Sequence, residues 1–590
     1  MAAQRAYTTH PLVLRRVTVR SVHQVTPRMR RVVLGGEELA AFTRDGTGHP
    51  AFAAPGFDDH IKLILAADGD VHAALPAQLP HGIEWTPAEH RLTRDYTPRR
   101  VDPEAGELHL DFVVHGDGPA EAWSAAAREG DELWFVGPKS SLRLPERLDW
   151  IQLVGDETAL PAIGRFLDER PLDAPAHVLV AVSDESARQE LALREGDTVT
   201  WVVAEPGDAE ALEAAVRALP VEAGEGYVWA AAESRVLLPV RRYLQRERKL
   251  PKDRLNVTGY WHREEAPAAE AEATADAAVR EPAGIPSPLP WLVARAALQL
   301  GVVDAVADAP GLSAVALAAR VGVPVAGVGV LLPLLSSYGV VVGADDGAPG
   351  LRLGPAGEEL LDEHEREEYT GHEAELLLAL THLAPALRGG GSPWRLASGG
   401  TLHEAVAQDA ERYGELVEEC EQLVFLLGGL TADPLWESIG TCLLTGPGSA
   451  SVAAALDDAG RRPRLRVAED AVPVAVLRGH VPAPDRIDWT AGPADVAVAA
   501  KALAHRTDEE AVLLLARLAG WTRTAVLVEA SRPDGLSPHA AEAALHAYAA
   551  TGSPLRDSAA IAALAHRSGW EVERTIALGW GTEATVLRRA

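Results

Sequence analysis

The stretch Arg94-Asp95-Tyr96-Thr97-Pro98-Arg99 places a phenol, a hydroxyl and two guanidinium groups on one short segment. Pro98 fixes its own φ and biases Thr97 away from helix, so the segment is predicted to be extended. Alternate side chains then share a face, with Arg94, Tyr96 and Pro98 on one side. A flat cofactor with a phosphate tail needs such a ring, hydroxyl and fork-shaped cation. A surface turn with a few arginines is the other interpretation, and the flanking sequence must decide between them.

The composition indicates a globular chain of several domains. With 590 residues, 47% hydrophobic and 24% charged, the chain is too long for one core, so two to four domains are expected. A formal net charge of −30 argues against nucleic acid or an anionic membrane as the main partner. Cys420 and Cys442 form no cluster, and the histidines show no metal-like spacing, so neither disulfides nor a metal site are expected. The sequence shows no signal segment and no apolar run long enough to span a bilayer, which predicts a cytoplasmic protein without membrane insertion.

Two kinds of pattern succeed each other in the first half of the chain. Up to about residue 148, short strand-like runs are separated by turn residues, which is typical of a small antiparallel β-barrel. From Trp150 onward, apolar strands alternate with helical segments, which predicts a parallel sheet covered by helices. Ligands of such sheets bind beyond the strand C-termini, so 155–158 and 230–233 form a candidate ligand edge. No G-x-G-x-x-G occurs there.

Residues 12–264 resemble the siderophore-interacting protein family, FAD-dependent ferric-siderophore reductases with a ferredoxin-reductase-like fold. The motifs that carry the resemblance are Arg94-x-Tyr96-Thr97-x-Arg99, Val113-Val114-His115-Gly116, Gly118-Pro119-Ala120 with Trp123, Gly137-Pro138-Lys139, Gly155-Asp156-Glu157-Thr158-Ala159 and Gly259-Tyr260-Trp261. The resemblance implies that NADH or NADPH passes hydride to FAD, and that the flavin gives single electrons to Fe(III) in a siderophore. A flavin is needed because hydride brings two electrons and iron accepts one.

The same resemblance implies three sets of site residues. The FAD set is Arg94, Tyr96, Thr97, Arg99, His115, Gly118, Pro119, Ala120, Trp123 and Ser124. The nicotinamide set is Asp156, Glu157, Thr158, Ala159, Ala231 and Glu233. The ferric-siderophore set is Lys62, Lys139 and Arg263. Free N–H groups at the helix start after Gly118 suit a pyrophosphate. Some of these residues have an alternative interpretation. Trp123 is nearly as well explained as a core residue as it is by stacking on a ring, and His115, taken alone, as a structural histidine. The three basic residues can also be explained as ordinary solvated cations.

The second half of the chain resembles small-molecule O-methyltransferases. An acidic, proline-containing linker, predicted to be disordered, precedes it. Helical segments over 291–338 and a wing-like 339–353 resemble the winged-helix dimerising region of that family, which implies a homodimer. Residues 401–413 fit the same family, and segments 443–450, 495–510, 526–529 and 552–556 resemble its Rossmann-like domain.

This half departs from the family at the methyl-donor loop. The family has an acid at the end of the first strand and three close glycines, whereas here Pro447 interrupts the loop and no acid precedes it. The candidate residues for a site resembling that for S-adenosylmethionine are Gly446, Gly448, Glu469, Asp470 and His505. Glu469 or Asp470 can hold a ribose. His505 stands where the family has its general base, but its neighbours differ, so a helix-surface histidine is the favoured interpretation. Binding of S-adenosylmethionine is therefore doubtful.

The sequence thus predicts a multidomain chain in five segments. They are an FAD-binding β-barrel (1–148), an NAD(P)H-binding α/β domain (149–264), a disordered linker (265–289), a winged-helix dimerisation-like domain (290–430) and a methyltransferase-like Rossmann domain (431–590). The predicted function is NAD(P)H-dependent, FAD-mediated reduction of ferric siderophores in iron acquisition, with the last two domains serving dimerisation or partner binding. The alternative is a bifunctional chain whose C-terminal half is an active O-methyltransferase.

Overall fold

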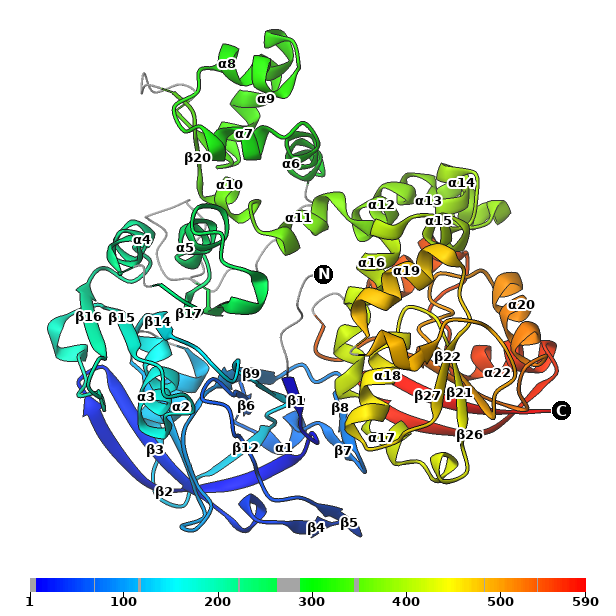
Figure 1. The fold of residues 1–590 in the computed structure, drawn as a ribbon, viewed down its shortest axis with the longest axis horizontal. Coiled ribbons are helices and arrows are strands. Elements are labelled where there is room, and N and C mark those ends of the chain that lie inside the picture. The colour runs from blue at the N-terminus through cyan, green and yellow to red at the C-terminus, as the bar shows by residue number, and fades with distance from the viewer. Residues whose placement is uncertain are drawn as a thin grey trace, which may run out of the picture. The chain divides into compact units, whose positions relative to one another are not determined.

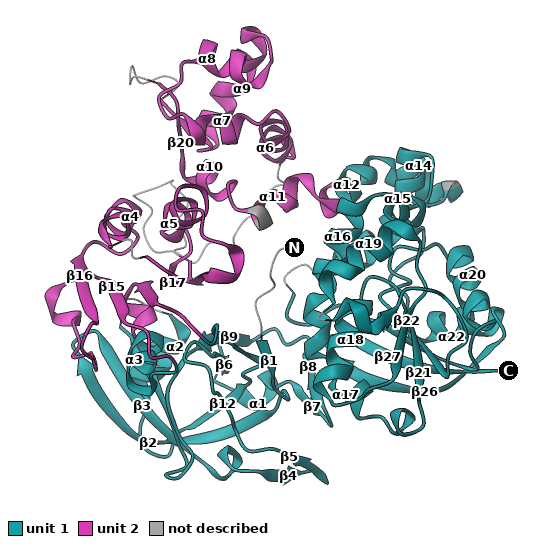
Figure 2. Cartoon of the chain, in the orientation of Figure 1, with its two compact units in different colours: residues 1–146, 161–171, 375–590 teal, residues 147–160, 172–374 magenta. Residues whose placement is uncertain are grey.

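The computed structural model describes residues 7–67, 69–114, 118–220, 223–262, 287–343, 350–481, 483–537 and 540–590 (Figure 1). The chain separates into two compact units (Figure 2). Unit 1 contains residues 1–146, 161–171 and 375–590, and unit 2 contains residues 147–160 and 172–374. His115, Arg263 and most of the predicted linker lie outside the described residues.

The N-terminal part of unit 1 is built on one seven-stranded antiparallel sheet, in the order β10-β11-β3-β2-β12-β6-β9. Its strands are β2 (Leu14–Thr26), β3 (Met29–Gly35), β6 (Ile61–Ala66), β9 (Arg91–Tyr96), β10 (Pro98–Asp102), β11 (Glu107–Val113) and β12 (Glu132–Val136). The two outermost strands, β9 and β10, are consecutive in the chain and only Thr97 separates them. Ile61 and Leu63 are fully buried while Lys62 between them is half-exposed, as strand alternation requires. The predicted antiparallel strands are therefore confirmed.

Shorter elements complete this part of unit 1. They are β1 (Tyr7–Thr9) paired with β13 (Ser140–Leu142), β4 (Phe42–Arg44) paired with β5 (Thr47–His49), β7 (Ala77–Leu79) paired with β8 (Gly82–Glu84), and the helices α1 (Val71–Ala74), α2 (Pro119–Ala126) and α3 (Leu160–Glu169).

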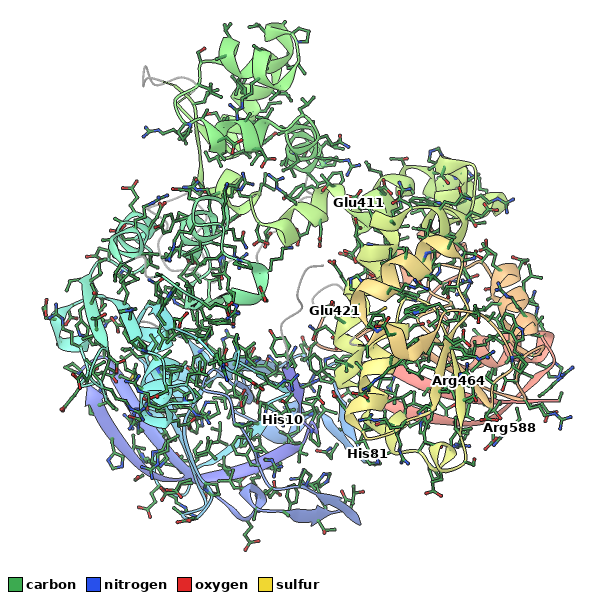
Figure 3. The ribbon with its side chains drawn as sticks, in the orientation of Figure 1. His10, His81, Glu411, Glu421, Arg464 and Arg588 are labelled. Atoms are coloured by element: carbon green, nitrogen blue, oxygen red, sulfur yellow. The ribbon has the colours of Figure 1, made fainter. Side chains whose placement is uncertain are left out.

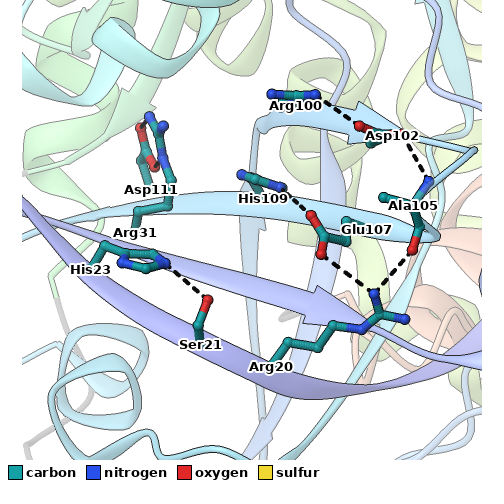
Figure 4. A network of polar contacts seen from close by, with 10 residues as sticks. All are labelled: Arg20, Ser21, His23, Arg31, Arg100, Asp102, Ala105, Glu107, His109 and Asp111. Atoms are coloured by element: carbon teal, nitrogen blue, oxygen red, sulfur yellow. Dashed lines mark hydrogen bonds and ion pairs between the residues drawn. The ribbon is translucent and has the colours of Figure 1, made fainter.

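Charged side chains cross neighbouring strands on one face of the sheet (Figure 4). Arg31 donates two hydrogen bonds to the buried Asp111 carboxylate, at 2.6 and 2.8 Å, from β3 to β11. Glu107 accepts from Arg20 at 3.4 Å and contacts His109 at 3.1 Å. Exposed pairs of this kind contribute little, but the bidentate pair on a buried carboxylate helps to fix the register of β3 on β11.

The first part of unit 2 is a five-stranded parallel sheet, as predicted, in the order β16-β15-β14-β17-β18. Its strands are β14 (Trp150–Gly155), β15 (Ala176–Val182), β16 (Thr198–Val203), β17 (Gly226–Glu233) and β18 (Leu255–Trp261), and its helices include α4 (Ala209–Ala218) and α5 (Leu237–Arg242). β14 and β17 are buried along their whole length, which is typical of central parallel strands.

Helices of the second half of the chain form the rest of unit 2. They are α6 (Leu289–Gln299), α7 (Val302–Asp308), α8 (Ala314–Val321), α9 (Val325–Ser337), α10 (Pro355–Glu359) and α11 (Glu363–Thr370), with the hairpin β19 (Val341–Val342) and β20 (Arg352–Leu353) where a wing was predicted. α6 to α9 share one apolar core. No single helix among the described residues could cross a membrane by length and composition, and only the bent pairs α6–α7 and α8–α9 pass that test together.

The C-terminal part of unit 1 has a second seven-stranded sheet, in the order β23-β22-β21-β24-β25-β27-β26. Its strands are β21 (Thr441–Thr445), β22 (Arg464–Val467), β23 (Ile487–Asp488), β24 (Val496–Ala500), β25 (Thr524–Ala530), β26 (Trp570–Gly579) and β27 (Thr582–Arg589). The first five strands are parallel and the final hairpin is antiparallel. The strand order reverses at β21, so a ligand of this sheet would bind beyond the end of β21.

The helices of this part precede and surround that sheet. They are α12 (His372–Ala379), α14 (Pro393–Ser398), α15 (Leu402–Gln408), α16 (Ala410–Glu419), η8 (Cys420–Phe425), α17 (Gly428–Ala432), α18 (Ser449–Asp458), α19 (Ala471–His480), α20 (Asp508–Leu518), α21 (Ala543–Thr551) and α22 (Ser558–Arg567).

Within unit 1, the N-terminal sheet and the C-terminal half pack together along a seam at β8 and the β26–β27 turn. Trp85, just after β8, lies 6.4 Å from Trp580 between ring centres. Gly579 has a φ of 104°, and a Cβ there would collide with the Ile83 carbonyl. The seam therefore depends on a glycine that lets two backbones approach closely.

Candidate functional site

The corner where β9 passes into β10 carries an aromatic row. The Tyr96 ring centre lies 4.5 Å from that of Phe112, which in turn lies 5.7 Å from that of Trp123. Thr97 is buried at the corner itself. Burial raises the pKa of Tyr96, so its hydroxyl stays protonated and can donate a hydrogen bond. Trp123 packs on the core of the sheet, as its alternative interpretation requires.

The two arginines of the motif have different surroundings. Arg94 is exposed and donates to the Thr93 carbonyl at 2.8 Å; no carboxylate pairs with it in the described part of the chain. Arg99 instead pairs with Asp168 of α3 at 2.7 Å. A Cβ at Gly164 would lie only 3.0 Å from the Arg99 side chain, so the guanidinium rests on bare helix backbone. Arg94 is therefore available to a phosphate, whereas Arg99 fastens α3 to the sheet.

Arg165 of α3 reinforces the same corner and was not recognised in the sequence. Its buried guanidinium donates to the carbonyl of Pro98 at 3.1 Å and to that of Ala54. An arginine in an amphipathic helix gives no signal that distinguishes such a contact from a solvated side chain.

The helix start predicted for a pyrophosphate has the expected form. Gly118 is the N-cap of α2 and offers no side chain to the first-turn N–H groups, and Pro119 occupies the first helical position. Ala120 is buried, and buried Ser124 donates to the Glu121 carbonyl at 2.9 Å. The backbone donors of the first turn are thus available to an anion.

The predicted nicotinamide edge is shaped by carboxylates that bind the protein itself. Asp156 accepts from Thr158 N and Oγ1 at 2.8 and 2.5 Å, from Glu233 N at 3.0 Å and from Trp261 Nε1 at 2.8 Å. Burial raises the pKa of Asp156, and these four donors oppose that shift. Asp156 therefore joins the ends of β14, β17 and β18.

The other two acids of this edge are similarly engaged. Glu157 accepts from the Ser183 N–H and hydroxyl at 2.8 and 2.5 Å, and Glu233 accepts from Val236 N at 2.9 Å. Ser183 gave no signal in the sequence. This edge therefore offers a ligand its backbone groups, the small side chains of Ala159 and Ala231, and the region around Thr158.

Two of the three predicted siderophore-binding cations are brought together. Lys62 donates to Asp95 at 2.8 and 3.1 Å across β6 and β9. Lys139 donates to Gln422 at 3.0 Å and lies 5.2 Å from the centre of the Phe425 ring. Burial lowers the pKa of Lys139, and the charges of Asp95 and Lys62 both act on it. Sequence reasoning missed Asp95, Gln422 and Phe425 as members of this group.

A row of hydrogen-bonded polar groups leads from the Lys139 backbone to the buried Asp59 carboxylate. The Lys139 carbonyl accepts from His10 N at 3.0 Å, and His10 Nε2 lies 2.7 Å from Ser141 Oγ. Ser141 Oγ donates to Asp59 at 2.7 Å, and Gly56 N donates to the same carboxylate at 2.8 Å. Burial raises the pKa of Asp59 to about 7. Figure 3 labels His10 and Glu421, the residue that precedes Gln422 in the sequence.

The glycine loop after β21 is held by protein groups. Glu469 accepts from Thr445 Oγ1 and from Gly446 N, both at 2.6 Å. Gly446 has a φ of 92°, and a Cβ there would collide with the Ala500 carbonyl. A Cβ at Gly448 would lie 2.8 Å from the Ala500 side chain. The loop thus packs on β24 and uses one oxygen of the carboxylate that could have held a ribose.

His505 is not the helix-surface histidine that was expected. It is buried in the turn before α20, where its ring centre lies 5.4 Å from that of His403. Its Nε2 lies 3.0 Å from the Arg506 guanidinium. Burial, assisted by Arg506, lowers the pKa of His403 to about 4. The expectation failed because the turn is buried with its charged residue, and the Arg506 guanidinium donates to the Ala502 carbonyl. Asp470, by contrast, is exposed at the start of α19.

Comparisons with known proteins match three segments of the chain to family models. Residues 18–142 match the siderophore-interacting FAD-binding domain, 148–264 the siderophore-interacting protein domain, and 292–363 the O-methyltransferase dimerisation domain. The NADPH-dependent ferric-chelate reductase of Escherichia coli K12 is 32% identical over 254 residues, which are 42% of this chain and 94% of that protein.

Solved structures resemble each half. A siderophore utilization protein from T. fusca is 36% identical, with a TM-score of 0.41, and covers 45% of this chain and 99% of its own. The O-methyltransferase NcsB1 from neocarzinostatin biosynthesis is 20% identical, with a TM-score of 0.41, and covers 52% of this chain and 97% of its own.

Proposed function

This chain belongs to the siderophore-interacting protein family, and we propose that it reduces Fe(III) held in a siderophore with electrons from NADPH or NADH, through FAD. The observation that carries the proposal is the β9–β10 corner. It combines a half-buried phenol, a buried hydroxyl at Thr97 and an arginine without a carboxylate partner among the described residues. The start of α2 adds uncapped backbone donors.

These residues fit FAD by the chemistry of their donors. Tyr96 offers a ring and a protonated hydroxyl to the isoalloxazine, and Thr97 offers a polar contact at its edge. Arg94 and the first turn of α2 would hold the two phosphates. Bound FAD supplies the exchange of a two-electron donor for single electrons that iron accepts. Arg99 and Arg165 keep α3 against the corner, so they act on the site through position.

We assign the nicotinamide to the edge at Asp156, Glu157 and Glu233, and the ferric chelate to Lys62 and Lys139. The edge braced by Asp156, Glu157 and Glu233 offers backbone and small side chains, which let a flat ring approach. Lys62 and Lys139 attract an anionic chelate within a strongly acidic chain. Reduction lowers the charge of the iron and weakens its bonds to hard oxygen ligands, which releases Fe(II) for iron acquisition.

For the C-terminal half we propose a scaffold and dimerisation role and assign no methyl transfer. The residues present do not fit a methyl-donor site, because Glu469 is bonded to Thr445 and Gly446 and the glycines pack on Ala500. Apolar side chains lie exposed on α6 and α9, including Leu292, Val325 and Val330 at 43%, 49% and 69%. A second copy of the chain would cover such side chains.

The absorption spectrum of the purified protein tests the central proposal. We expect flavin bands, oxidation of NADPH or NADH, and formation of Fe(II) when a ferric siderophore is added. A protein that contains no flavin and gains none when FAD is added would refute the proposal. Light scattering should report a dimer, and a monomeric mass would refute the role given to α6 to α9.

A further inference from the structure

The Lys139 ammonium is held by two neutral groups from the C-terminal half. Its Nζ donates to Gln422 Oε1 at 3.0 Å and lies 5.2 Å from the centre of the Phe425 ring. Gln422 lies 283 residues away in the chain, and both partners belong to η8. Neither an amide oxygen nor an aromatic ring carries a formal charge. The contact therefore orients the ammonium without cancelling its positive charge.

An acid would be the ordinary partner for a lysine that only joined two domains. The chain has 85 acidic residues, and one of them, Glu421, stands next to Gln422 in η8. The hydrogen bond nevertheless goes to the amide. The acid whose charge acts on Lys139, Asp95, is already bonded to Lys62. Among the described residues whose charges act on Lys139, one lysine and one aspartate offset each other, so the charge of Lys139 itself remains.

We propose that η8 forms one wall of the ferric-chelate site, with Gln422 as a positioning residue that aims the Lys139 ammonium at an anionic chelate. Phe425 covers one side of the ammonium and reduces its contact with water. The inference rests on the proposed reductase function and deepens it, because it gives the C-terminal half a part in substrate binding. It also gives the site a preference for chelates with net negative charge, such as Fe(III) tris-catecholates, over neutral or cationic trihydroxamates.

The substitution Gln422→Glu separates this role from a structural one. A carboxylate keeps the shape of the side chain and strengthens the contact with Lys139, so the melting temperature should not fall. It also cancels the positive charge that the substrate would meet. We expect kcat/KM for a ferric tris-catecholate to fall about tenfold, mainly through KM, as for the loss of one charge-assisted contact. The difference from wild type should shrink as salt rises.

Three measurements serve as controls. Gln408→Glu makes the same chemical change on an exposed position of α15 and should behave like wild type. Reduction of FAD by the nicotinamide should be unchanged in Gln422→Glu. Activity with a ferric trihydroxamate should also be unchanged, because that chelate does not depend on the Lys139 charge.

Titration with the Ga(III) tris-catecholate measures binding alone, since this chelate has the charge of the iron complex and is not reduced. Its affinity should fall in Gln422→Glu and persist in Gln408→Glu. Equal affinity of Gln422→Glu and wild type would overturn the inference, as would an equal loss of trihydroxamate activity. A wild-type chain that reduces no ferric chelate would refute the reductase function and this wall together, whereas reduction that is indifferent to Gln422→Glu refutes the wall alone.

Discussion

The Glu84 carboxylate accepts a hydrogen bond from Arg532 at 3.0 Å, although Arg532 lies 448 residues further along the chain. The same carboxylate accepts from Gly581 N at 3.2 Å and is almost fully buried. A buried carboxylate requires such donors, because an unpaired one is costly. Within unit 1, the C-terminal part is therefore packed against the N-terminal sheet through a contact that neither part can make alone.

Arg532→Ala should destabilise this seam. Glu84 would keep only the Gly581 N–H, and we expect a loss of about 1–2 kcal/mol, limited because the Arg532 side chain is 48% exposed. Denaturant unfolding of the full chain measures it. Arg16→Ala is the matched control, since Arg16 is 53% exposed and its partner Glu132 is 38% exposed, so a smaller loss is expected there. Equal losses in the two variants would show that the seam contact is no stronger than a surface pair.

Arg94→Ala and Arg99→Ala should differ in flavin affinity. Arg94 is exposed and has no carboxylate partner among the described residues, so its loss should weaken FAD binding by about 1.5–3 kcal/mol, roughly 10- to 150-fold. Arg99 pairs with Asp168, so its loss should mainly lower stability, by about 1 kcal/mol. Fluorescence titration of the flavin-free proteins with FAD gives the affinities. A comparable loss of FAD affinity in Arg99→Ala would show that Arg99 also binds the cofactor.

The strands and their faces could be predicted from the sequence, but most of the partners could not. Strand alternation puts Ile61 and Leu63 on the face opposite Lys62, and in the structure the first two are buried while Lys62 is half-exposed. The partner of Lys62 depends on the register of β6 on β9, which places Asp95 opposite it. Gln422 reaches Lys139 only through the packing of two distant domains, and no local pattern encodes that.

Local pattern also did not show which charged residues are buried. Asp156 and Glu157 belong to a motif at a predicted ligand edge, and the motif did not show that their carboxylates bond to neighbouring strands and to Ser183, while binding of a nicotinamide at this edge stays a prediction. His505 was expected on a helix surface because its neighbours differ from those of the family's general base, yet both His505 and Arg506 are buried. Burial of a charge depends on tertiary partners, which a single sequence does not show.

Gly446→Ala should destabilise the C-terminal half without affecting the flavin. The residue has a φ of 92°, and its new Cβ would collide with the Ala500 carbonyl. Gly460→Ala is the matched control, because Gly460 also has a positive φ, 69°, but nothing lies within 4 Å of the added Cβ. We expect both variants to lose about 1 kcal/mol or more from backbone strain, with a clearly larger loss at Gly446. Similar losses would contradict the packing of the loop on β24.

Titration of the wild-type chain with S-adenosylmethionine should give no binding signal. Glu469, the acid that could hold a ribose, already accepts from the Thr445 hydroxyl and the Gly446 amide. Both bonds hold one oxygen of this carboxylate against the loop, which leaves only the other oxygen for a ribose. Micromolar binding accompanied by methyl transfer to a phenol or catechol would restore the bifunctional alternative.

Asp59→Asn should change how stability depends on pH. Burial raises the folded-state pKa of Asp59 to about 7, from an ordinary value near 3.8. The folded chain therefore binds a proton that the unfolded chain releases between these two values. The stabilisation from the protonated carboxyl is complete below about pH 4 and is lost as the pH rises through about 7. Over this interval the free energy of unfolding of the wild type should fall by about 3–4 kcal/mol relative to Asp59→Asn, which cannot ionise. Above about pH 8 the difference in free energy of unfolding between the two proteins should be constant.

Denaturant unfolding at several pH values, followed by flavin fluorescence, measures this difference in free energy. A difference that does not change between pH 4 and 8 would show that Asp59 is ionised throughout, with Ser141 and Gly56 N sufficient to hold the charge.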